Sequence, residues 1–221
     1  MISSVIPRRP LLGAHLGDVG RLELVKVAAF LAMVADHVDL VLYERAVPWL
    51  HQLGAFAFPA FALTFGIGLA RSRDPCAVAR RLVVPGLLAQ AAWWPLQPAH
   101  PVNMLLVFAT LAAVLSVAGP AALRVGLLLG AALGVGAVGE GGIFTVALVF
   151  GGYAAGLNGR WWPLLLCGGA WVAVAPSYGA VAALLAVAVW PANWPRPPRG
   201  RGWLAWGYPA HLLALAGLAA G

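Results

Sequence analysis

Residues 22–43 read LELVKVAAFLAMVADHVDLVLY, and this run decides the fold class. It is long and apolar enough to cross a bilayer, since a spanning helix needs about 20 mostly apolar residues. It nevertheless contains Lys26, Asp36, His37 and Asp39. An ionisable side chain at the centre of a membrane helix costs roughly 2.5–3.5 kcal/mol, so these residues predict a bundle interior or a water-filled cavity.

The rest of the chain has the same apolar character. Of its 221 residues, 62% are hydrophobic and 10% are charged, whereas soluble domains carry about 25% charged residues. Apolar runs and breaks at Gly, Pro and charged residues predict nine spans, or eight if the break at 176–179 is only a kink. The spans are 22–43, 48–70, 78–96, 102–117, 121–138, 141–157, 162–174, 177–190 and 203–220.

The sequence therefore predicts an all-α polytopic membrane protein with one domain over 22–221. Residues 1–21 form a short cytoplasmic segment whose apolar stretch is too short for a signal peptide. Basic residues fall in alternate loops, with Arg45 as the exception. The positive-inside rule then places the amino terminus in the cytoplasm and the carboxyl terminus outside.

The net charge of +7 follows from this loop bias and does not indicate a nucleic-acid partner. No basic stretch is interleaved with base-stacking aromatic residues. Tryptophans at predicted span ends are interpreted as interfacial anchors; they are Trp93, Trp94, Trp161, Trp162, Trp190 and Trp194. The two cysteines form no metal-binding spacing, and no metal site is predicted.

Two histidines within spans are the main candidates for chemistry. His37 follows Asp36 directly, and a carboxylate near an imidazole fixes its tautomer, as a general base requires. Lys26 and Met33 lie on the same helical stripe as His37. His211 lies about 12 Å along the last span, near the membrane centre, whereas His37 lies toward the outer leaflet. Pro209 opens the helix beside His211.

Further polar residues have simpler explanations. Asp39 ends the first span, where its carboxylate reaches the headgroups, and Glu140 lies in a glycine-rich outer turn as a solvated or inward-dipping acid. A basic cluster precedes the third span, and it binds either anionic lipid headgroups or the phosphates of a nucleotide-like cofactor. The cluster consists of Arg71, Arg73, Arg80 and Arg81.

Five motifs occur in order over nearly the whole chain. They are LVKVA…MVADH at 24–37, GAFAFPAFA at 54–62, RRL at 80–82, NML at 103–105 and YPAHL at 208–212. Together they resemble the TraX family of conjugative pilus proteins, with Ala55 where that family commonly has an arginine. The resemblance implies a relative of integral-membrane acyltransferases that acetylates the amino terminus of the pilin subunit with acetyl-CoA.

The resemblance yields a hypothesis for the site. The four arginines hold the CoA phosphates, and His37, oriented by Asp36, deprotonates the pilin amine or relays the acetyl group. His211 assists from the facing helix, while Lys26 stabilises charge or contacts the thioester. Auxiliary roles are assigned to Asp39, Glu140, Asn103 and Tyr208.

Three other functions remain open at this point. The same residues would serve an enzyme that closes pilin head to tail, without CoA. A small transporter would relay protons through Asp36, His37, Glu140 and His211, although no internal repeat supports it. A non-enzymatic pilin chaperone would use the small-residue grooves alone and would tolerate the loss of His37.

Overall fold

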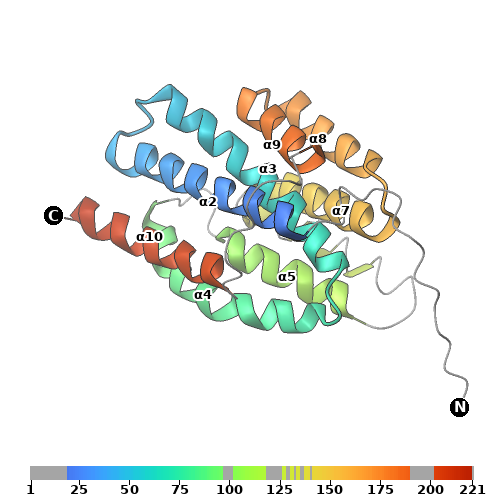
Figure 1. The fold of residues 1–221 in the computed structure, drawn as a ribbon. Helices are drawn as coiled ribbons and strands as arrows, with labels where there is room; N and C mark the ends of the chain where they lie inside the picture. The colour runs from blue at the N-terminus through green and yellow to red at the C-terminus, as the bar shows by residue number, and fades with distance from the viewer. Residues whose placement is uncertain are drawn as a thin grey trace, which may run out of the picture.

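The computed structural model describes residues 19–96, 102–117, 126–127, 130–131, 133–134, 137–139, 141–189 and 202–220. In this part of the chain the protein is all-α, as predicted, and β pairing is limited to an isolated bridge between Val102 and Gly139. Eight labelled helices make up the described part (Figure 1): α2 (Val19–Leu42), α3 (Pro48–Ala70), α4 (Pro75–Leu96), α5 (Met104–Ser116), α7 (Gly142–Asn158), α8 (Trp162–Val174), α9 (Tyr178–Val189) and α10 (Trp203–Ala220).

Each labelled helix corresponds to one predicted span. The predicted span 121–138 lies largely outside the described residues, and those of its residues that are described are helical. The break at 176–179 is a turn between two separate helices, because α8 ends at Val174 and α9 begins at Tyr178. Helices that follow one another run in opposite directions from α2 to α5 and again from α7 to α10, whereas α5 and α7 run the same way, as do α2 and α10 (Figure 1).

Capping residues set the helix ends that hydropathy misplaced. The α4 helix begins earlier than predicted because Asp74 Oδ1 accepts the N–H of Ala77 at 2.8 Å and Pro75 opens the first turn. The α5 helix begins after Asn103, whose side-chain oxygen accepts the N–H groups of Leu105 and Leu106. Hydropathy alone carries no signal for these hydrogen bonds.

The α3 helix lies against α2, α7 and α9 and forms the centre of the bundle. Glycines let its backbone touch its neighbours: a Cβ at Gly66 would overlap the α7 backbone, and a Cβ at Gly152 would overlap the α3 backbone. Fully buried Leu63 and Leu148 fill the same contact. Close packing through small residues is typical of helices that associate in lipid.

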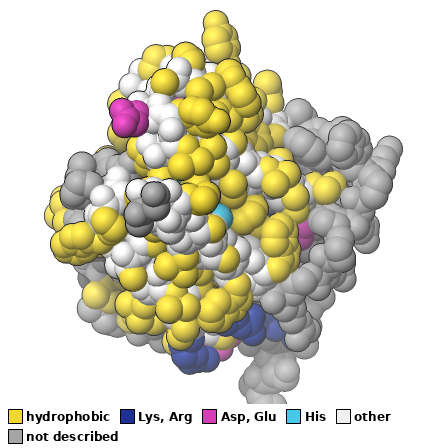
Figure 2. Space-filling model, turned by 90° about the vertical axis from the view of Figure 1, so that its left-hand side faces the viewer, with side chains coloured by type: hydrophobic (Ala, Val, Ile, Leu, Met, Phe, Trp, Pro, Cys, Tyr) yellow, Lys and Arg dark blue, Asp and Glu magenta, His cyan; other side chains and the backbone are white. Residues whose placement is uncertain are grey.

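The surface of the described helices carries many large apolar side chains. Leu31, Leu87, Leu166, Leu185 and Leu218 are each more than half exposed. Hydrophobic side chains also cover most of the described part of the bundle end shown in Figure 2. Among the described helices, α3 alone is long and apolar enough to cross a membrane, and the shorter apolar helices are Met104–Ser116, Gly142–Asn158, Trp162–Val174 and Tyr178–Ala188.

The last helix is displaced along the bundle relative to the first. The ring of Trp203, at the start of α10, lies 5.7 Å from that of Phe30, which is well inside α2. Gly207 permits this contact, because a Cβ there would come within 2.9 Å of the Phe30 ring. The start of α10 at Trp203 thus lies level with Phe30 rather than with Leu22, where the first span was predicted to begin, and these two residues are about 12 Å apart along α2. This displacement brings His211 to the level of His37.

Candidate functional site

The first and last helices meet at a pair of histidines. His37 Nδ1 and His211 Nε2 are 2.7 Å apart, and the two rings are stacked at 10° with centroids 5.1 Å apart. His37 is buried, with 3% of its surface exposed. The sequence predicted that His37 and His211 lie at different depths in the membrane. This prediction was wrong, because the displacement of α10 brings both imidazoles to the same level.

The hydrogen bonds of His211 assign the tautomers of the pair. His211 Nδ1 lies 3.1 Å from the carbonyl oxygen of Gly207, which can only accept, so Nδ1 donates. A neutral His211 then accepts at Nε2, and His37 donates from Nδ1. His37 Nε2 therefore carries the lone pair that a general base needs.

Aromatic side chains surround the pair. Trp93 lies 5.6 Å and Tyr208 6.3 Å from the His37 ring, while Phe30 lies 5.8 Å from the His211 ring. Trp93 is 3% exposed, so its predicted role as an interfacial anchor is wrong, whereas Trp94 is 62% exposed. Two adjacent helical residues point about 100° apart, so one member of the Trp93-Trp94 pair could have been expected to face inward.

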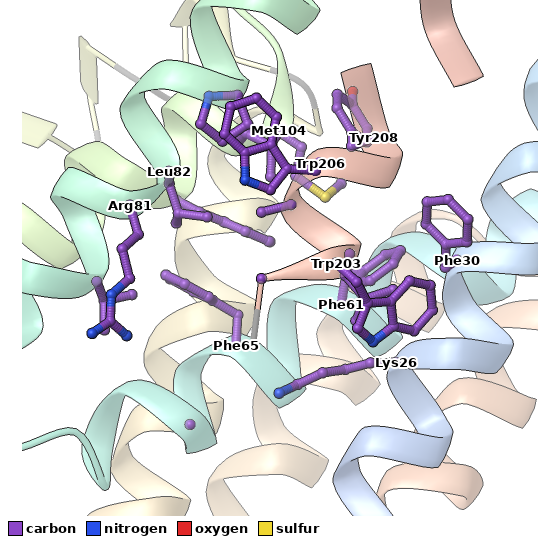
Figure 3. Close-up of a pocket in the computed structure, with 18 of the residues that line it drawn as sticks. Lys26, Phe30, Phe61, Phe65, Arg81, Leu82, Met104, Trp203, Trp206 and Tyr208 are labelled. Carbon is purple, nitrogen blue, oxygen red and sulfur yellow. The ribbon is translucent and has the colours of Figure 1, made fainter. Parts of the chain in front are cut away.

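A cavity of about 910 Å³ lies among α2, α3, α4, α5 and α10, next to the histidine pair (Figure 3). Its wall is mainly apolar and aromatic, and includes Phe30, Met33, Phe61, Phe65, Phe108 and Trp203. Tyr208 and Phe30 belong both to this wall and to the rings around the histidines. The cavity thus reaches the aromatic shell of the histidine pair.

The other end of the cavity is basic. Figure 3 shows Lys26 extending from α2 and Arg81 from α4 on facing sides, and Arg80 also lines the cavity. Lys26 forms an ion pair with Glu23 at 2.7 Å, and Arg80 forms one with Asp74 at 3.6 Å. Lys26 and His37 are separated by about 16 Å along α2. The cavity therefore extends from a cationic mouth to the aromatic residues beside the histidine pair, and neither histidine is among its lining residues.

The predicted arginine cluster is divided by this arrangement. Arg80 and Arg81 line the cavity, whereas Arg71 and Arg73 are not among its lining residues. Arg71 ends α3, and partial burial lowers the pKa of its guanidinium. Only the half of the cluster on α4 is placed to meet a ligand in the cavity.

Asp36 does not orient His37, which corrects the expected acid–base pair. Its carboxylate is ion-paired with Arg45 and lies 3.7 Å from His51 Nδ1. His37 is bonded to His211 instead. Adjacent residues point about 100° apart on a helix, so Asp36 faces the α2–α3 loop while His37 faces α10.

Two of the auxiliary candidates have structural roles. Asp39 is fully buried, and its Oδ1 accepts the N–H of Val47 at 2.9 Å, directly before α3. Asn103 is also fully buried, and its Nδ2 donates to Gly86 O at 2.9 Å and to Gln90 Oε1 at 2.8 Å. Asp39 fixes the α2–α3 loop rather than reaching headgroups, and Asn103 clamps α4 to α5.

The other candidates have different outcomes. Tyr208 lies beside the histidines, with 4% of its surface exposed, and Lys26 lies at the mouth of the cavity. Glu140 lies outside the described residues. No group of three or more His, Cys, Asp or Glu within the described part of the chain is arranged to hold a metal ion.

Comparison with known proteins gives one family and one curated relative. Residues 21–219 match the family described as TraX protein. Protein TraX of Escherichia coli is 35% identical over 101 residues, which cover 44% of this chain and 40% of that protein. The alignment thus spans less than half the length of that relative. No solved structure matches the chain.

Proposed function

The chain belongs to the TraX protein family, and from this membership we propose that it is a membrane-embedded enzyme of a conjugation system. In this proposal it transfers an acetyl group from acetyl-CoA to the amino terminus of the pilin subunit. The observation that carries the proposal is a cavity that is lined by Lys26, Arg80 and Arg81 and that also reaches Phe30 and Tyr208, two rings packed against the histidine pair. A basic opening that leads toward a buried base suits a phosphate-bearing acyl donor.

The proposal places residues 22–221 in the bacterial inner membrane as a single multi-pass domain. The exposed leucines and the alternating helix directions support it (Figure 1). Arg71, Arg73 and Arg160 lie in loops at one end of the bundle, Arg80 and Arg81 lie in the first two turns of α4 at the same end, and Arg45 lies at the other end. By the positive-inside rule the arginine-rich end is cytoplasmic and the carboxyl terminus is periplasmic.

Acetyl-CoA is held from the cytoplasmic end. Its phosphates pair with Arg80 and Arg81, because guanidinium groups bind phosphate bidentately. Lys26 adds positive charge on the facing wall. The thin arm that carries the thioester follows the apolar cavity toward His37. CoA supplies the acetyl group as an activated thioester, and the protein supplies the proton transfers.

His37 acts as the general base. An α-amino group has a pKa of about 7.7–8.0 in solution, so an imidazole is well matched to its proton. His37 Nε2 takes that proton, and the amine nitrogen attacks the thioester carbonyl, forming the C–N bond as the C–S bond breaks. His211 holds the His37 ring in position and keeps the reactive lone pair on Nε2. His211 is therefore a positioning residue.

Intact-mass measurement of mature pilin tests the proposal. Pilin from cells with the wild-type protein is expected to carry one acetyl group, and pilin from cells with no protein or with His37→Ala is expected to lack it. Loss of one water from wild-type pilin would indicate head-to-tail cyclisation instead. Equal masses in all samples would contradict both enzymatic functions and favour transport or chaperoning.

A further inference from the structure

A second, small cavity borders His37. Its volume is about 60 Å³, and Asp36, His37 and Gly54 line it. Met33, Phe61 and Met104 line both this cavity and the large one. Two of these three shared residues are methionines, whose unbranched side chains adapt their shape readily. The imidazole of His37 borders the small cavity.

Asp36 supplies the negative charge at this second cavity. Its side chain is 16% exposed and is held close to α3, where a Cβ at Gly54 would overlap the carboxylate. A partly buried carboxylate requires a cation or hydrogen-bond donors. The structure meets this requirement with Arg45 of the α2–α3 loop as an ion-pair partner and with His51, in the first turn of α3, at 3.7 Å.

Arg45 differs from Asp36 in how it is held. Its side chain is 37% exposed and comes from a turn rather than a helix. Glu44 and Arg45 have φ angles of 51° and 66°, in the left-handed region that residues with a Cβ rarely adopt. Arg45 NH1 also lies 3.3 Å from His51 Nδ1. The guanidinium that pairs with Asp36 thus comes from an exposed turn with an unfavourable backbone conformation, so another cation can replace it.

We propose that Asp36 is the binding site for the protonated amino terminus of the acceptor peptide, and that Arg45 occupies this site until the acceptor displaces it. This inference deepens the proposed function and rests on it. A primary ammonium group has the charge and hydrogen-bond donors of the guanidinium that it replaces. The acetyl donor and the acceptor then approach His37 through different cavities.

The reaction at this site balances without further reactants. The ammonium bound by Asp36 gives one proton to His37 Nε2, and the neutral amine attacks the thioester carbonyl. The amide C–N bond forms, the C–S bond breaks, and the second amine proton leaves with the thiolate, which departs as the thiol. His37 returns its proton to water, so the products are the acetylated amine, the thiol and one proton.

Steady-state kinetics with the full-length protein test the inference. The probe is tetra-alanine amide, whose only charge is its α-ammonium group, with acetyl-CoA as donor. Asp36→Asn is expected to raise the KM for the peptide about tenfold or more, as expected for the loss of a charge-assisted hydrogen bond. Arg45→Gln is expected to lower the same KM several-fold, because it removes the competing cation.

The two substitutions are expected to change the peptide KM in opposite directions, and this distinguishes a binding role of Asp36 from a merely structural one. If the Asp36–Arg45 pair only holds the loop, both substitutions break the same ion pair and both move the KM in the same direction, which would overturn the inference. Asp36→Glu keeps the carboxylate and is expected to retain a lower KM than Asp36→Asn. Arg160→Gln, on an exposed loop of the opposite end, is the matched arginine control. Failure of the wild type to acetylate the peptide would instead overturn the proposed function itself.

Discussion

Asp36 and His37 are neighbours in the sequence, yet they belong to two different regions of the molecule. Asp36 lies in an ionic cluster with Arg45 and His51, at the turn between α2 and α3. His37 lies in an aromatic enclosure, bonded to His211 on α10. The same turn of α2 therefore places the carboxylate of Asp36 beside an exposed partner that the acceptor can replace. It places the neutral imidazole of His37 beside His211, a partner that stays in position.

Under the proposed function, this difference would let a single helix separate substrate recognition from proton transfer. The ionic region is made by a loop that follows directly in the chain, and its partners are partly exposed. The aromatic region depends on residues 174 positions apart in sequence, and His37 there is buried. Substitutions in the first region are expected to change substrate affinity, and substitutions in the second are expected to change the rate constant.

The largest expected effect is at the histidines. His37→Ala is expected to lower kcat by about 10²–10⁴-fold, the usual contribution of a general base. His211→Ala removes the acceptor that fixes the His37 tautomer and is expected to lower kcat by a smaller factor. Because both act through one imidazole, the double variant is expected to be no slower than His37→Ala alone. Additive losses, measured as acetyl transfer to peptide, would contradict the assignment of His211 as a positioning residue.

The cationic mouth offers the next largest effect. Arg81→Ala and Lys26→Met are each expected to raise the KM for acetyl-CoA about tenfold, since each charged contact is worth about 1.5–3 kcal/mol. Arg73→Ala is the matched control, because Arg73 is exposed and does not line the cavity. An equal rise in KM for Arg73→Ala would indicate that the loop, not the cavity, binds the donor.

Two glycines allow the regions to be disturbed separately. Gly207→Ala crowds the Phe30 ring beside His211 and is expected to lower kcat, while Gly54→Ala crowds Asp36 and is expected to raise the KM for the acceptor. Each is expected to destabilise the protein by about 1–3 kcal/mol, as overpacking does. Gly169→Ala, where a Cβ meets nothing within 4 Å, is the control for helix propensity in thermal unfolding. Identical kinetic effects of Gly207→Ala and Gly54→Ala would remove the distinction between the regions.

Asp39 is expected to give the smallest effect. It shares the first span with Asp36 and His37, but its carboxylate is buried. Its Oδ1 accepts the backbone N–H of Val47, and its Oδ2 has no hydrogen-bond partner among the residues that the structure describes. Asp39→Asn keeps the acceptor oxygen and is expected to change the free energy of unfolding little. Asp39→Ala leaves the Val47 N–H unsatisfied and is expected to cost about 1–3 kcal/mol. A loss of acetyl transfer by Asp39→Asn at unchanged stability would show that this acid takes part in the chemistry.

Hydropathy predicted the labelled helices, but it left open whether the break at 176–179 separates two helices, as the structure has it, or kinks one. Each span depends on a local run of residues, so one sequence contains the necessary information. The contact between His37 and His211 was not predictable in the same way. It depends on the displacement of α10 along α2, which Phe30, Gly207 and Trp203 set through tertiary contacts.

The candidate site was predictable in its residue types but only partly in its partners. An ionisable residue inside an apolar run is conspicuous because its insertion into a membrane costs free energy. Lys26, His37 and His211 were singled out for this reason. The sequence offers no comparable signal for Trp93, because an aromatic residue suits both a membrane interface and a buried wall. Proximity along the chain favoured Asp36 as the partner of His37, whereas helix geometry turns the two apart.

The bond between the first and last described helices also has a consequence for biosynthesis. His37 is translated early, but its hydrogen-bond partner follows 174 residues later. A chain still being synthesised, or one cut before α10, holds the arginines and Asp36 without an oriented base. The protein is therefore expected to gain activity only when α10 is inserted beside α2, so that no unfinished chain can modify a substrate in the membrane.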